Sequence, residues 1–321
     1  MNSHFIVIGA GLSGLNIARK INDLKLGSVE VLEKSRGVGG RMATRRTLDT
    51  KFDHGAQFYR LKEDITKLHQ SWKQNGISHQ WFVSNLGDHW CASSGMTSLA
   101  KSLAENLQIN LLKEIRTIRY ENKMWKIISR DNEEWLCNNL IISSPTPQTV
   151  NLLNELSTES VIDSNLFSEL KKISYTKALI ALITLEEDFI LNDSGYCEFE
   201  AGQFFSISDQ KRKGVSNIPA FTVTMSAEFS ESEFENSEEL ILHKILEIFK
   251  SDYPKAKIKN AELKKWRYCR PQTQINKLFL EIAPGLFLIG DAFGGSSLLG
   301  AVRSSEALGN YLTERHESKL D

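Results

Sequence analysis

Apolar runs and helical stripes alternate in the first part of the chain. Residues 5–8 form a continuous apolar run of the length expected for a buried parallel strand, and residues 28–32 are predicted to be the second strand. Between them lies an apolar stripe at helical spacing, made of Ile17, Ala18, Ile21 and Leu24. The order strand, helix, strand predicts an α/β fold that opens with a parallel unit.

The middle of the chain predicts mainly short strands. Helices are expected at 64–75 and 97–106, where apolar residues recur at helical spacing. Pro145 and Pro147 mark the exit from this region. We predict strands at 80–83, 89–91, 109–112, 115–121, 125–129, 135–136 and 140–142.

The remaining pattern predicts a second, mixed sheet with helices beside it. A helix is expected over about 149–170, and the acidic segment 230–239 is interpreted as a solvated loop and helix start. Ser237 is the expected N-cap of a helix that ends near Lys250. Its predicted buried face consists of Leu240, Ile241, Ile245, Ile248 and Phe249. Further strands are predicted at 178–185, 202–208, 220–226 and 286–289.

A glycine-rich turn joins the first strand to the first helix. Residues 9–14 read G-x-G-x-x-G, in which the first glycine permits a tight turn and the second lets the backbone approach a diphosphate. The third lets the helix pack close to the strand. The helix N-terminus would offer N–H groups and a positive dipole end to the diphosphate. The predicted contact residues are Gly9, Gly11, Leu12, Ser13 and Gly14.

An acidic residue follows the second strand at the spacing of a ribose-binding group. Glu33 lies 19 positions after Gly14, close to the ~20 typical of dinucleotide-binding units. A carboxylate there favours a free ribose 2′-hydroxyl, and therefore FAD or NAD over a 2′-phosphate. The alternative interpretation is a solvated charge at the strand end.

A second glycine pair with an arginine follows almost at once. Residues 35–42 read SRGVGGRM, and such a loop is expected to cross the diphosphate again with backbone N–H groups and a guanidinium. A simple NAD-binding unit does not need this loop, so it favours FAD. The alternative is a flexible basic loop. The candidate residues here are Lys34, Arg36, Gly40, Arg41 and Met42.

These blocks resemble the FAD-binding signature of the flavin amine oxidase superfamily. The resemblance covers 9–14, Glu33, 39–41 and 53–58, and KSRGVGGRM followed by DHGAQF is most similar to the renalase branch. It implies that the Gly-Ala-Gln segment lies beside the flavin ring and that the arginine contacts the diphosphate. The residues that take these roles are Gly55, Ala56, Gln57, Phe58 and Arg41.

The resemblance resumes near the carboxyl end of the chain. Gly290 and Asp291 match the family segment whose aspartate holds a ribitol hydroxyl. Gly300 and Ala301 match a helix N-terminus that points at the flavin N1/O2 edge. Leu299 stands where these families usually carry an acid. FAD binding should survive this departure because it depends mainly on backbone groups.

The resemblance implies a two-lobed α/β flavoprotein. We expect a Rossmann-like FAD-binding domain of the glutathione-reductase type, with an inserted mixed-sheet substrate domain. The predicted FAD-binding domain is discontinuous and comprises 1–60, 94–148 and 284–321. The predicted substrate domain comprises 61–93 and 149–283.

Composition excludes several other classes of protein. The chain has 321 residues, 41% hydrophobic and 25% charged, and a net charge of −1, so we expect no nucleic-acid partner. The basic run 211–213 is interpreted as a solvated loop. Apolar runs are too short for a membrane span, and the first strand begins too early for a signal peptide, so a cytoplasmic protein is expected. Four dispersed cysteines and seven histidines without ligand spacing predict no metal site.

The resemblance also implies an activity. Renalase-like proteins oxidise the 2- and 6-dihydro isomers of NADH or NADPH, with O2 as acceptor, to NAD(P)+ and H2O2. We expect FAD to be bound non-covalently, with Gln57, Phe204 and Trp266 as candidate pocket residues. The alternatives are an amine oxidase or desaturase acting on another small molecule, and a flavoprotein without turnover. The oligomeric state stays open.

Overall fold

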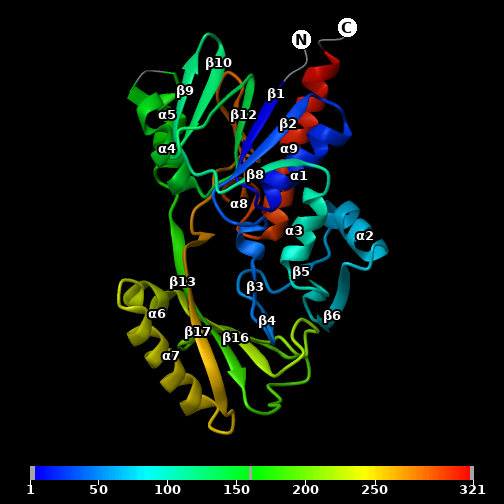
Figure 1. The fold of residues 1–321 in the computed structure, drawn as a ribbon, viewed down its shortest axis with the longest axis vertical. Coiled ribbons are helices and arrows are strands. Elements are labelled where there is room, and N and C mark those ends of the chain that lie inside the picture. Colours follow the sequence, from blue (N-terminus) through cyan, green and yellow to red (C-terminus); the bar gives the residue numbers. More distant parts are fainter. Residues whose placement is uncertain (1–3, 159–160, 319–321) are drawn as a thin grey trace. The chain divides into compact units, whose positions relative to one another are not determined.

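A computed structural model describes residues 4–158 and 161–318. By compactness the chain divides into two units, each built from segments far apart in the sequence (Figure 1). The first unit comprises 1–40, 100–174 and 271–321, and the second comprises 41–99 and 175–270.

The first unit is built on a six-stranded sheet, ordered β18-β19-β12-β1-β2-β8. All neighbouring strands are parallel except β18 and β19, which are antiparallel. The central strand, β1, lies between β2 and β12 and its side chains are almost entirely buried, as the apolar run predicted. The strands are β1 (His4–Ile8), β2 (Ser28–Glu33), β8 (Gln108–Leu111), β12 (Asn139–Ile142), β18 (Leu280–Ala283) and β19 (Leu286–Leu288).

Helices α1 (Leu12–Asp23) and α9 (Leu298–Glu317) pack on each other beside this sheet (Figure 1). A buried hydrogen bond of 2.9 Å from Asn16 Nδ2 to Ser305 Oγ joins them. The predicted stripe of α1 is buried except for Leu24, which caps the helix and is 48% exposed. The first and last parts of the chain therefore form one core.

The meander predicted within the first unit is confirmed. It is a separate three-stranded antiparallel sheet of β9 (Ile115–Glu121), β10 (Met124–Ser129) and β11 (Glu134–Cys137). Its Trp125 is fully buried and donates a hydrogen bond from Nε1 to Pro284 O (3.1 Å). This bond ties the meander to the turn before β19.

The single helix predicted over 149–170 is wrong. The structure has α4 (Thr146–Thr158) and α5 (Ser164–Leu170), and residues 159–160 lie outside the described part. The first helix starts before Pro147, because a proline is tolerated in a first helical turn, where its missing N–H has no partner to lose. The second has its own N-cap, since Asp163 accepts from the backbone N–H groups of Asn165 and Leu166.

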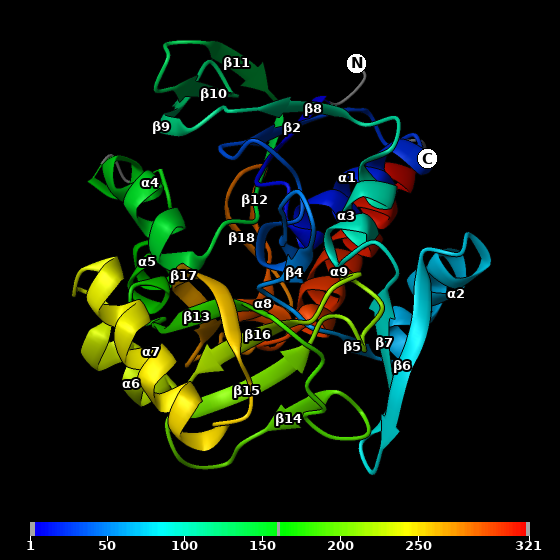
Figure 2. The same ribbon diagram turned by 60° about the horizontal axis from the view of Figure 1, so that its bottom comes forward.

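The second unit is built on a five-stranded sheet, ordered β14-β15-β16-β13-β17. Helices α6 (Ala227–Glu233) and α7 (Glu238–Asp252) cover one face and bury an apolar core against it (Figure 2). The strands are β13 (Tyr175–Leu185), β14 (Tyr196–Glu198), β15 (Phe204–Asp209), β16 (Ala220–Met225) and β17 (Ile258–Pro271).

The acidic segment 230–239 is not simply a loop. Its first part belongs to α6, which sequence periodicity missed because the helix has only two turns. Ser226 caps α6 by accepting from Phe229 N (3.2 Å), and Ser237 caps α7 as predicted. Leu240, expected inside, is 43% exposed, whereas Ile241, Ile245 and Phe249 are fully buried.

A smaller aromatic sheet and a hairpin complete the second unit. The predicted strands near 80 and 90 are β6 (Ser78–Ser84) and β7 (Gly87–Ala92), and a short strand, β5 (Tyr59–Arg60), pairs with β7. Helix α2 (Thr66–Gln74) buries Trp72 there, and α3 (Thr97–Ala104) contains the boundary between the units. The hairpin consists of β3 (Thr44–Arg46) and β4 (Lys51–Asp53).

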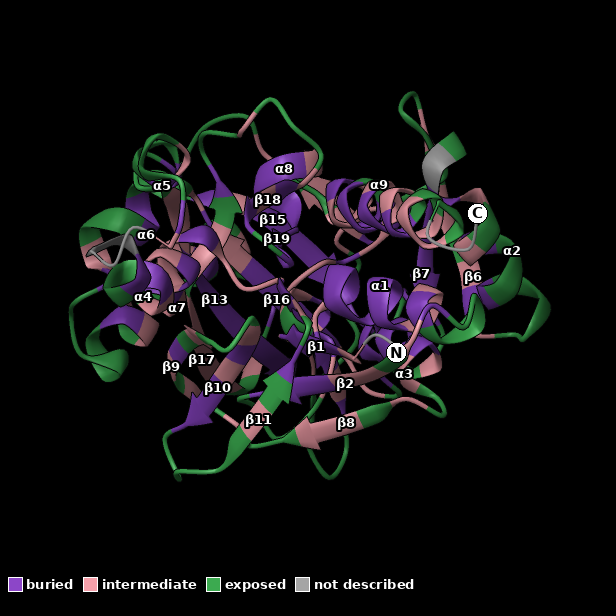
Figure 3. Cartoon of the chain, turned by 90° about the horizontal axis from the view of Figure 1, so that it is seen from above, coloured by how far each residue is buried: buried purple, intermediate pink, exposed green. Residues whose placement is uncertain are grey.

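The compact units differ in extent from the predicted functional domains. Residues 41–60 and 94–99 fall in the second unit, and 149–174 and 271–283 fall in the first. Compactness does not test which residues bind cofactor or substrate, so the functional division stays a prediction. Buried residues concentrate in the strands and the inner helix faces (Figure 3). Among the described residues, no helix is long and apolar enough to cross a membrane.

Replacing Gly14 by alanine should destabilise the first unit. A Cβ at Gly14 would lie 2.0 Å from the carbonyl oxygen of Gly9, so the backbone itself would have to move. We expect Gly14→Ala to lower the free energy of unfolding by about 2 kcal/mol or more. Thermal unfolding should be compared with Gly37→Ala, whose Cβ would meet nothing within 4 Å. Equal midpoints for the two variants would contradict the close-packing role of Gly14.

Candidate functional site

The turn between β1 and α1 has the shape expected of a diphosphate cradle. Gly9 has a φ of +103°, which favours glycine. The backbone of Gly9 lies so close to Gly14 that a Cβ there would be 2.0 Å from the Gly9 carbonyl oxygen, so the helix starts directly against the end of the strand. Among the described residues, no side chain caps the N-terminus of α1. A Cβ added at Gly11 would meet nothing within 4 Å. The first N–H groups of α1, at Leu12 and Ser13, are therefore available beside open space.

Glu33 is held against this turn and is not a solvated charge. It is buried, and its Oε2 accepts from Ala10 N (2.7 Å) while its Oε1 accepts from Ser35 N (2.8 Å). Each carboxylate oxygen keeps a second lone pair. The side chain can therefore still accept from a ribose hydroxyl, and its position next to the glycine motif fits that role.

The second glycine loop returns to the first. Gly39 N donates to Ala10 O (2.8 Å), and a Cβ at Gly40 would lie 3.3 Å from the Cα of Gly11. Backbone from both motifs is thus brought together, as predicted. Lys34 and Arg36 have exposed side chains, and the Lys34 ammonium donates to Gln148.

The carboxyl-terminal block lies in the same unit. Gly290 N donates to Ser304 Oγ (2.9 Å), and Asp291 is buried at the start of α8 (Asp291–Gly294). At the start of α9, Ser297 Oγ accepts from Gly300 N (3.3 Å), and Ser297 O accepts from Ala301 N. These N–H groups already have partners, so the predicted flavin contact of this helix falls to its remaining first-turn N–H groups.

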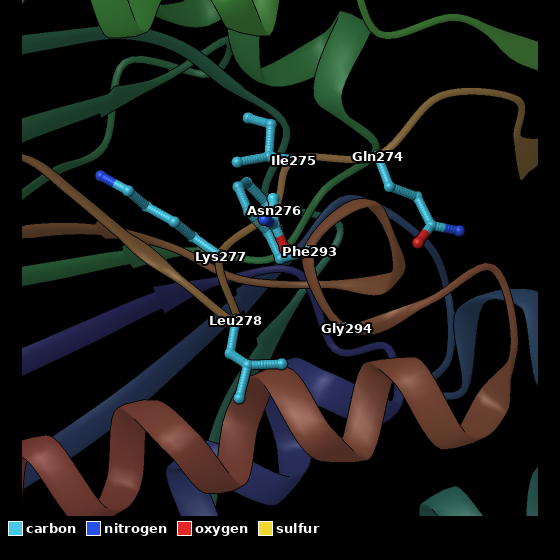
Figure 4. A pocket seen from close by; sticks show the side chains of 7 residues that line it. All are labelled: Gln274, Ile275, Asn276, Lys277, Leu278, Phe293 and Gly294. Atoms are coloured by element: carbon cyan, nitrogen blue, oxygen red, sulfur yellow. The ribbon is translucent and has the colours of Figure 1, made fainter.

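A depression of about 340 Å³ opens beside α8 (Figure 4). Its lining mixes amide, ammonium and apolar groups, and Ile275 N donates to Ala292 O (3.0 Å) to fix the loop against α8. In Figure 4, the side chains of Gln274 and Lys277 extend to opposite sides of the loop. The lining residues are Gln274, Ile275, Asn276, Lys277, Leu278, Phe293 and Gly294.

In the second unit, a buried ion pair organises the Asp-His-Gly-Ala-Gln segment. Asp53 and Lys213 are both fully buried, and Lys213 Nζ donates to Asp53 Oδ2 (2.7 Å). The other carboxylate oxygen accepts from Thr44 Oγ1 (2.6 Å) and Met96 N (2.8 Å). Four separate stretches of chain therefore meet at one carboxylate.

Gln57 points into this network. Its Nε2 donates to Asp53 O (2.7 Å) and Gly55 O (3.2 Å), and its Oε1 accepts from Gln210 Nε2 (3.1 Å) and Lys213 Nζ (3.3 Å). All four hydrogen-bonding positions of the amide are used. The predicted proximity of this segment to a flavin would therefore involve the backbone of Gly55, Ala56 and Gln57, not the Gln57 amide.

Arg41 anchors the same segment from the other side. Its carbonyl oxygen accepts from Ala56 N (2.9 Å), and a Cβ at Gly55 would lie 1.9 Å from that oxygen. Its guanidinium donates to Cys269 O (3.0 Å) and lies over the ring of Tyr175. Met42, the next residue, is buried and its carbonyl accepts from Thr97. The predicted diphosphate contact of Arg41 stays a prediction.

The aromatic candidates have different positions. Trp266 stacks on His54 with ring centroids 5.6 Å apart and donates from Nε1 to His54 O (2.8 Å). Phe204 is buried in the core beneath α6 and α7, and its place in a pocket wall stays a prediction. Phe58 packs edge-on against a cluster of rings, namely Trp81, Phe82, His89 and Tyr196.

His54 is the histidine of this segment, and it is a weak base. Burial, together with the positive charges of Lys264 and Arg45, lowers the pKa of His54 from 6.5 to about 4. Its ring is therefore neutral at physiological pH. Among the described residues, no cluster of histidine, cysteine or carboxylate side chains could hold a metal ion.

Two models of known protein families match the chain. A model described as an NAD(P)-binding Rossmann-like domain matches residues 7–74. A second, described as flavin-containing amine oxidoreductase, matches residues 73–307, which is more than half of the chain. The chain belongs to the flavin-containing amine oxidoreductase family. It is therefore an FAD-dependent oxidoreductase with a Rossmann-like domain and a mixed sheet.

Solved structures share this fold. A protein from Exiguobacterium sp. 255-15, described as a candidate protoporphyrinogen oxidase, has a TM-score of 0.76 and 11% identity, with 98% of this chain and 99% of that chain covered. A redesigned triple mutant of putrescine oxidase has a TM-score of 0.76, 13% identity and the same coverage. An oxidoreductase from Methanosarcina mazei has a TM-score of 0.70 and 15% identity, covering 96% and 100%. At these identities the likeness concerns the fold.

The residues of the first unit fit the adenosine diphosphate part of FAD. The uncapped helix, the open space at Gly11 and the lone pairs of Glu33 offer N–H donors, room and acceptors. The interpretation of residues 211–213 as a solvated loop is wrong for Lys213, which is fully buried. Its neighbours Lys211 and Arg212 are exposed, and nothing in the local sequence separates Lys213 from them.

Removing the ammonium of the buried pair should be costly. Lys213→Met leaves the Asp53 carboxylate without its cation, and we expect a loss of about 3–5 kcal/mol in the free energy of unfolding. Adding Asp53→Asn removes the unpaired charge while an amide oxygen still accepts from Thr44 and Met96. Chemical denaturation should therefore show the double variant to be more stable than Lys213→Met. Additive losses would contradict a buried charge pair.

Stability should depend on the protonation of His54. Because its pKa is about 4 when folded and 6.5 in the unfolded reference, the unfolded chain binds the proton more tightly between these values. His54 therefore contributes stability above pH 6.5 that is lost as pH falls towards 4, by up to about 3 kcal/mol. His54→Gln should flatten this part of the pH profile, and an NMR titration should place the His54 pKa well below 6.5.

Proposed function

We propose that this flavoprotein oxidises a neutral hydride donor, the 2- or 6-dihydro isomer of NADH or NADPH, in a renalase-type reaction. One observation carries the proposal. The ionisable groups of the Asp-His-Gly-Ala-Gln segment are either fully paired or unable to hold a proton at neutral pH. Such an environment suits a reaction that requires orientation of the substrate and no strong base.

The ion pair of Asp53 with Lys213 is occupied by contacts within the protein. The Lys213 ammonium donates to Asp53 and to Gln57, and it lies 5.2 Å from the centroid of the Trp81 ring. These contacts occupy the directions in which a lysine would hold a water for amine oxidation. His54, with a pKa of about 4, is too weak to remove a proton from a protonated amine.

The proposed reaction balances without a protein base. The ring nitrogen lone pair of the donor drives the departure of a hydride, which leaves NAD(P)+. FAD supplies the two-electron acceptor, and O2 takes the two electrons with two protons to give H2O2. The chain holds the donor and the Gly55–Ala56 backbone in place, and the Trp266–His54 stack fixes the course of this backbone.

Further parts of the proposal concern the setting of the cofactor. We infer that the FAD-binding domain is of the glutathione-reductase type. We also infer that FAD is bound non-covalently, because burial raises the pKa of Cys91 and Cys137 to about 12 and leaves both as unreactive thiols. All four cysteines lie among the described residues and none forms a disulfide. That supports a reducing compartment, the cytoplasm. The predicted substrate domain, 61–93 and 149–283, is part of the same proposal.

The second candidate is oxidation of an amine. The family description favours it, and an amine is also a small molecule whose oxidation can use O2. It requires a group that accepts the ammonium proton or selects the neutral amine. The two candidates therefore differ in how the reductive rate should depend on pH.

Anaerobic stopped-flow mixing decides between them. We expect the 2- and 6-dihydro isomers to bleach the flavin absorbance rapidly, and ordinary NADH and simple polyamines to leave it unchanged. Because no protein base takes part, the limiting rate should be flat between about pH 6 and 9. Bleaching by amines with a rate that rises with pH would instead establish the second candidate.

A further inference from the structure

We propose that Arg270 is an anion anchor for the phosphate groups of the substrate. This inference rests on the proposed function, because dihydronicotinamide dinucleotides carry a diphosphate that amines lack. It also makes a claim of its own. The second unit should bind a phosphate-bearing molecule at Arg270 whatever reaction follows.

The guanidinium of Arg270 is exposed and held in place. It lies over the ring of Phe205, 4.3 Å from the centroid, in a cation–π contact. A register shift in β15 between residues 204 and 206 accounts for the position of Phe205. Phe204 packs in the buried core, whereas the ring of Phe205 is half-buried and contacts Arg270. A guanidinium ordered in this way loses little freedom when it binds an anion.

Within the described residues, the guanidinium of Arg270 forms no ion pair and no hydrogen bond. Glu198 forms no ion pair with it, and its carboxylate accepts a hydrogen bond of 3.1 Å from the Tyr196 hydroxyl. Burial raises the pKa of Tyr196, Glu198 raises it further, and Arg270 opposes the rise, so both charges act on this phenol. The guanidinium of Arg270, which has no ion-pair partner among the described residues, is therefore free to bind an anion.

Arg270 lies near the candidate site. Its positive charge acts on the phenol of Tyr196. The ring of Tyr196 contacts Phe58, the residue that follows the Asp-His-Gly-Ala-Gln segment, with ring centroids 5.1 Å apart. On the same strand, β17, Arg267 pairs with Glu235 (3.0 Å). Among the described residues, β17 therefore offers one arginine without an ion pair, Arg270, and one paired arginine as its control.

The chemistry selects phosphate or diphosphate as the ligand. A guanidinium presents a fork of N–H donors that binds two oxygens of a phosphate at once. The same positive charge repels a protonated amine. Arg270 therefore favours an anionic substrate over a cationic one, and its predicted effect is on affinity, without a part in hydride transfer.

The first experiment measures binding without turnover. Inorganic diphosphate is titrated calorimetrically into the FAD-loaded protein in phosphate-free buffer, with Arg270→Gln and Arg267→Gln as matched variants. We expect saturable binding that weakens about tenfold or more in Arg270→Gln and stays within about twofold in Arg267→Gln. Arg270→Lys should retain part of the affinity. Equal affinity for wild type and Arg270→Gln, or no binding up to about 10 mM, would overturn the proposal.

The second experiment compares two donors reduced at the same ring position, the dinucleotide and an N-methyl dihydronicotinamide without phosphate. Arg270→Gln should raise the apparent Kd for the dinucleotide about tenfold, with the limiting reductive rate unchanged, and should leave the phosphate-free donor unaffected. An equal effect on both donors would show that Arg270 acts elsewhere than on phosphate. If neither donor reduces the wild-type flavin, the proposed function fails, and the diphosphate titration alone decides whether Arg270 binds anions.

Discussion

The buried pair of Asp53 and Lys213 is the interaction on which the second unit depends. A carboxylate and an ammonium with no exposure are stable in a protein interior only if each is neutralised and hydrogen-bonded. Here the β3–β4 hairpin, the turn before α3, the turn after β15 and the Gln57 loop converge to meet that demand. The demand fixes the backbone of the segment that the family resemblance places beside a flavin.

The same network shapes the chemistry open to the protein. Groups that elsewhere could carry protons are used to hold the fold, and His54 is kept neutral by burial and by nearby cations. In the proposed function, the substrate would meet weakly basic groups together with the positive charge of Arg270. Orientation and charge selection can act there, and these are the contributions that a hydride transfer driven by the donor's own lone pair requires.

Much of the first unit could be predicted because its signals are local. The glycine turn, the Glu33 spacing and the strand patterns of β1, β2 and β12 depend on residues close in sequence, and the structure confirms these strands. Errors arose where local signals compete. A proline inside a first turn concealed the start of α4, and the shortness of α6 concealed it within an acidic stretch. Phe204 and Phe205 are neighbours of one kind, and a register shift separates their positions.

The sequence by itself determined the α/β class, the nucleotide-binding turn and the family, because backbone geometry at glycines and the spacing of an acid are local constraints. Tertiary structure alone decided that Lys213 of a basic run is buried and that the Gln57 amide is fully hydrogen-bonded inside the protein. It also decided that Arg270 forms no ion pair with any of the described residues. These facts concern which distant groups share one low-dielectric interior. Burial and pairing are properties of the packed chain, and residue type does not reveal them.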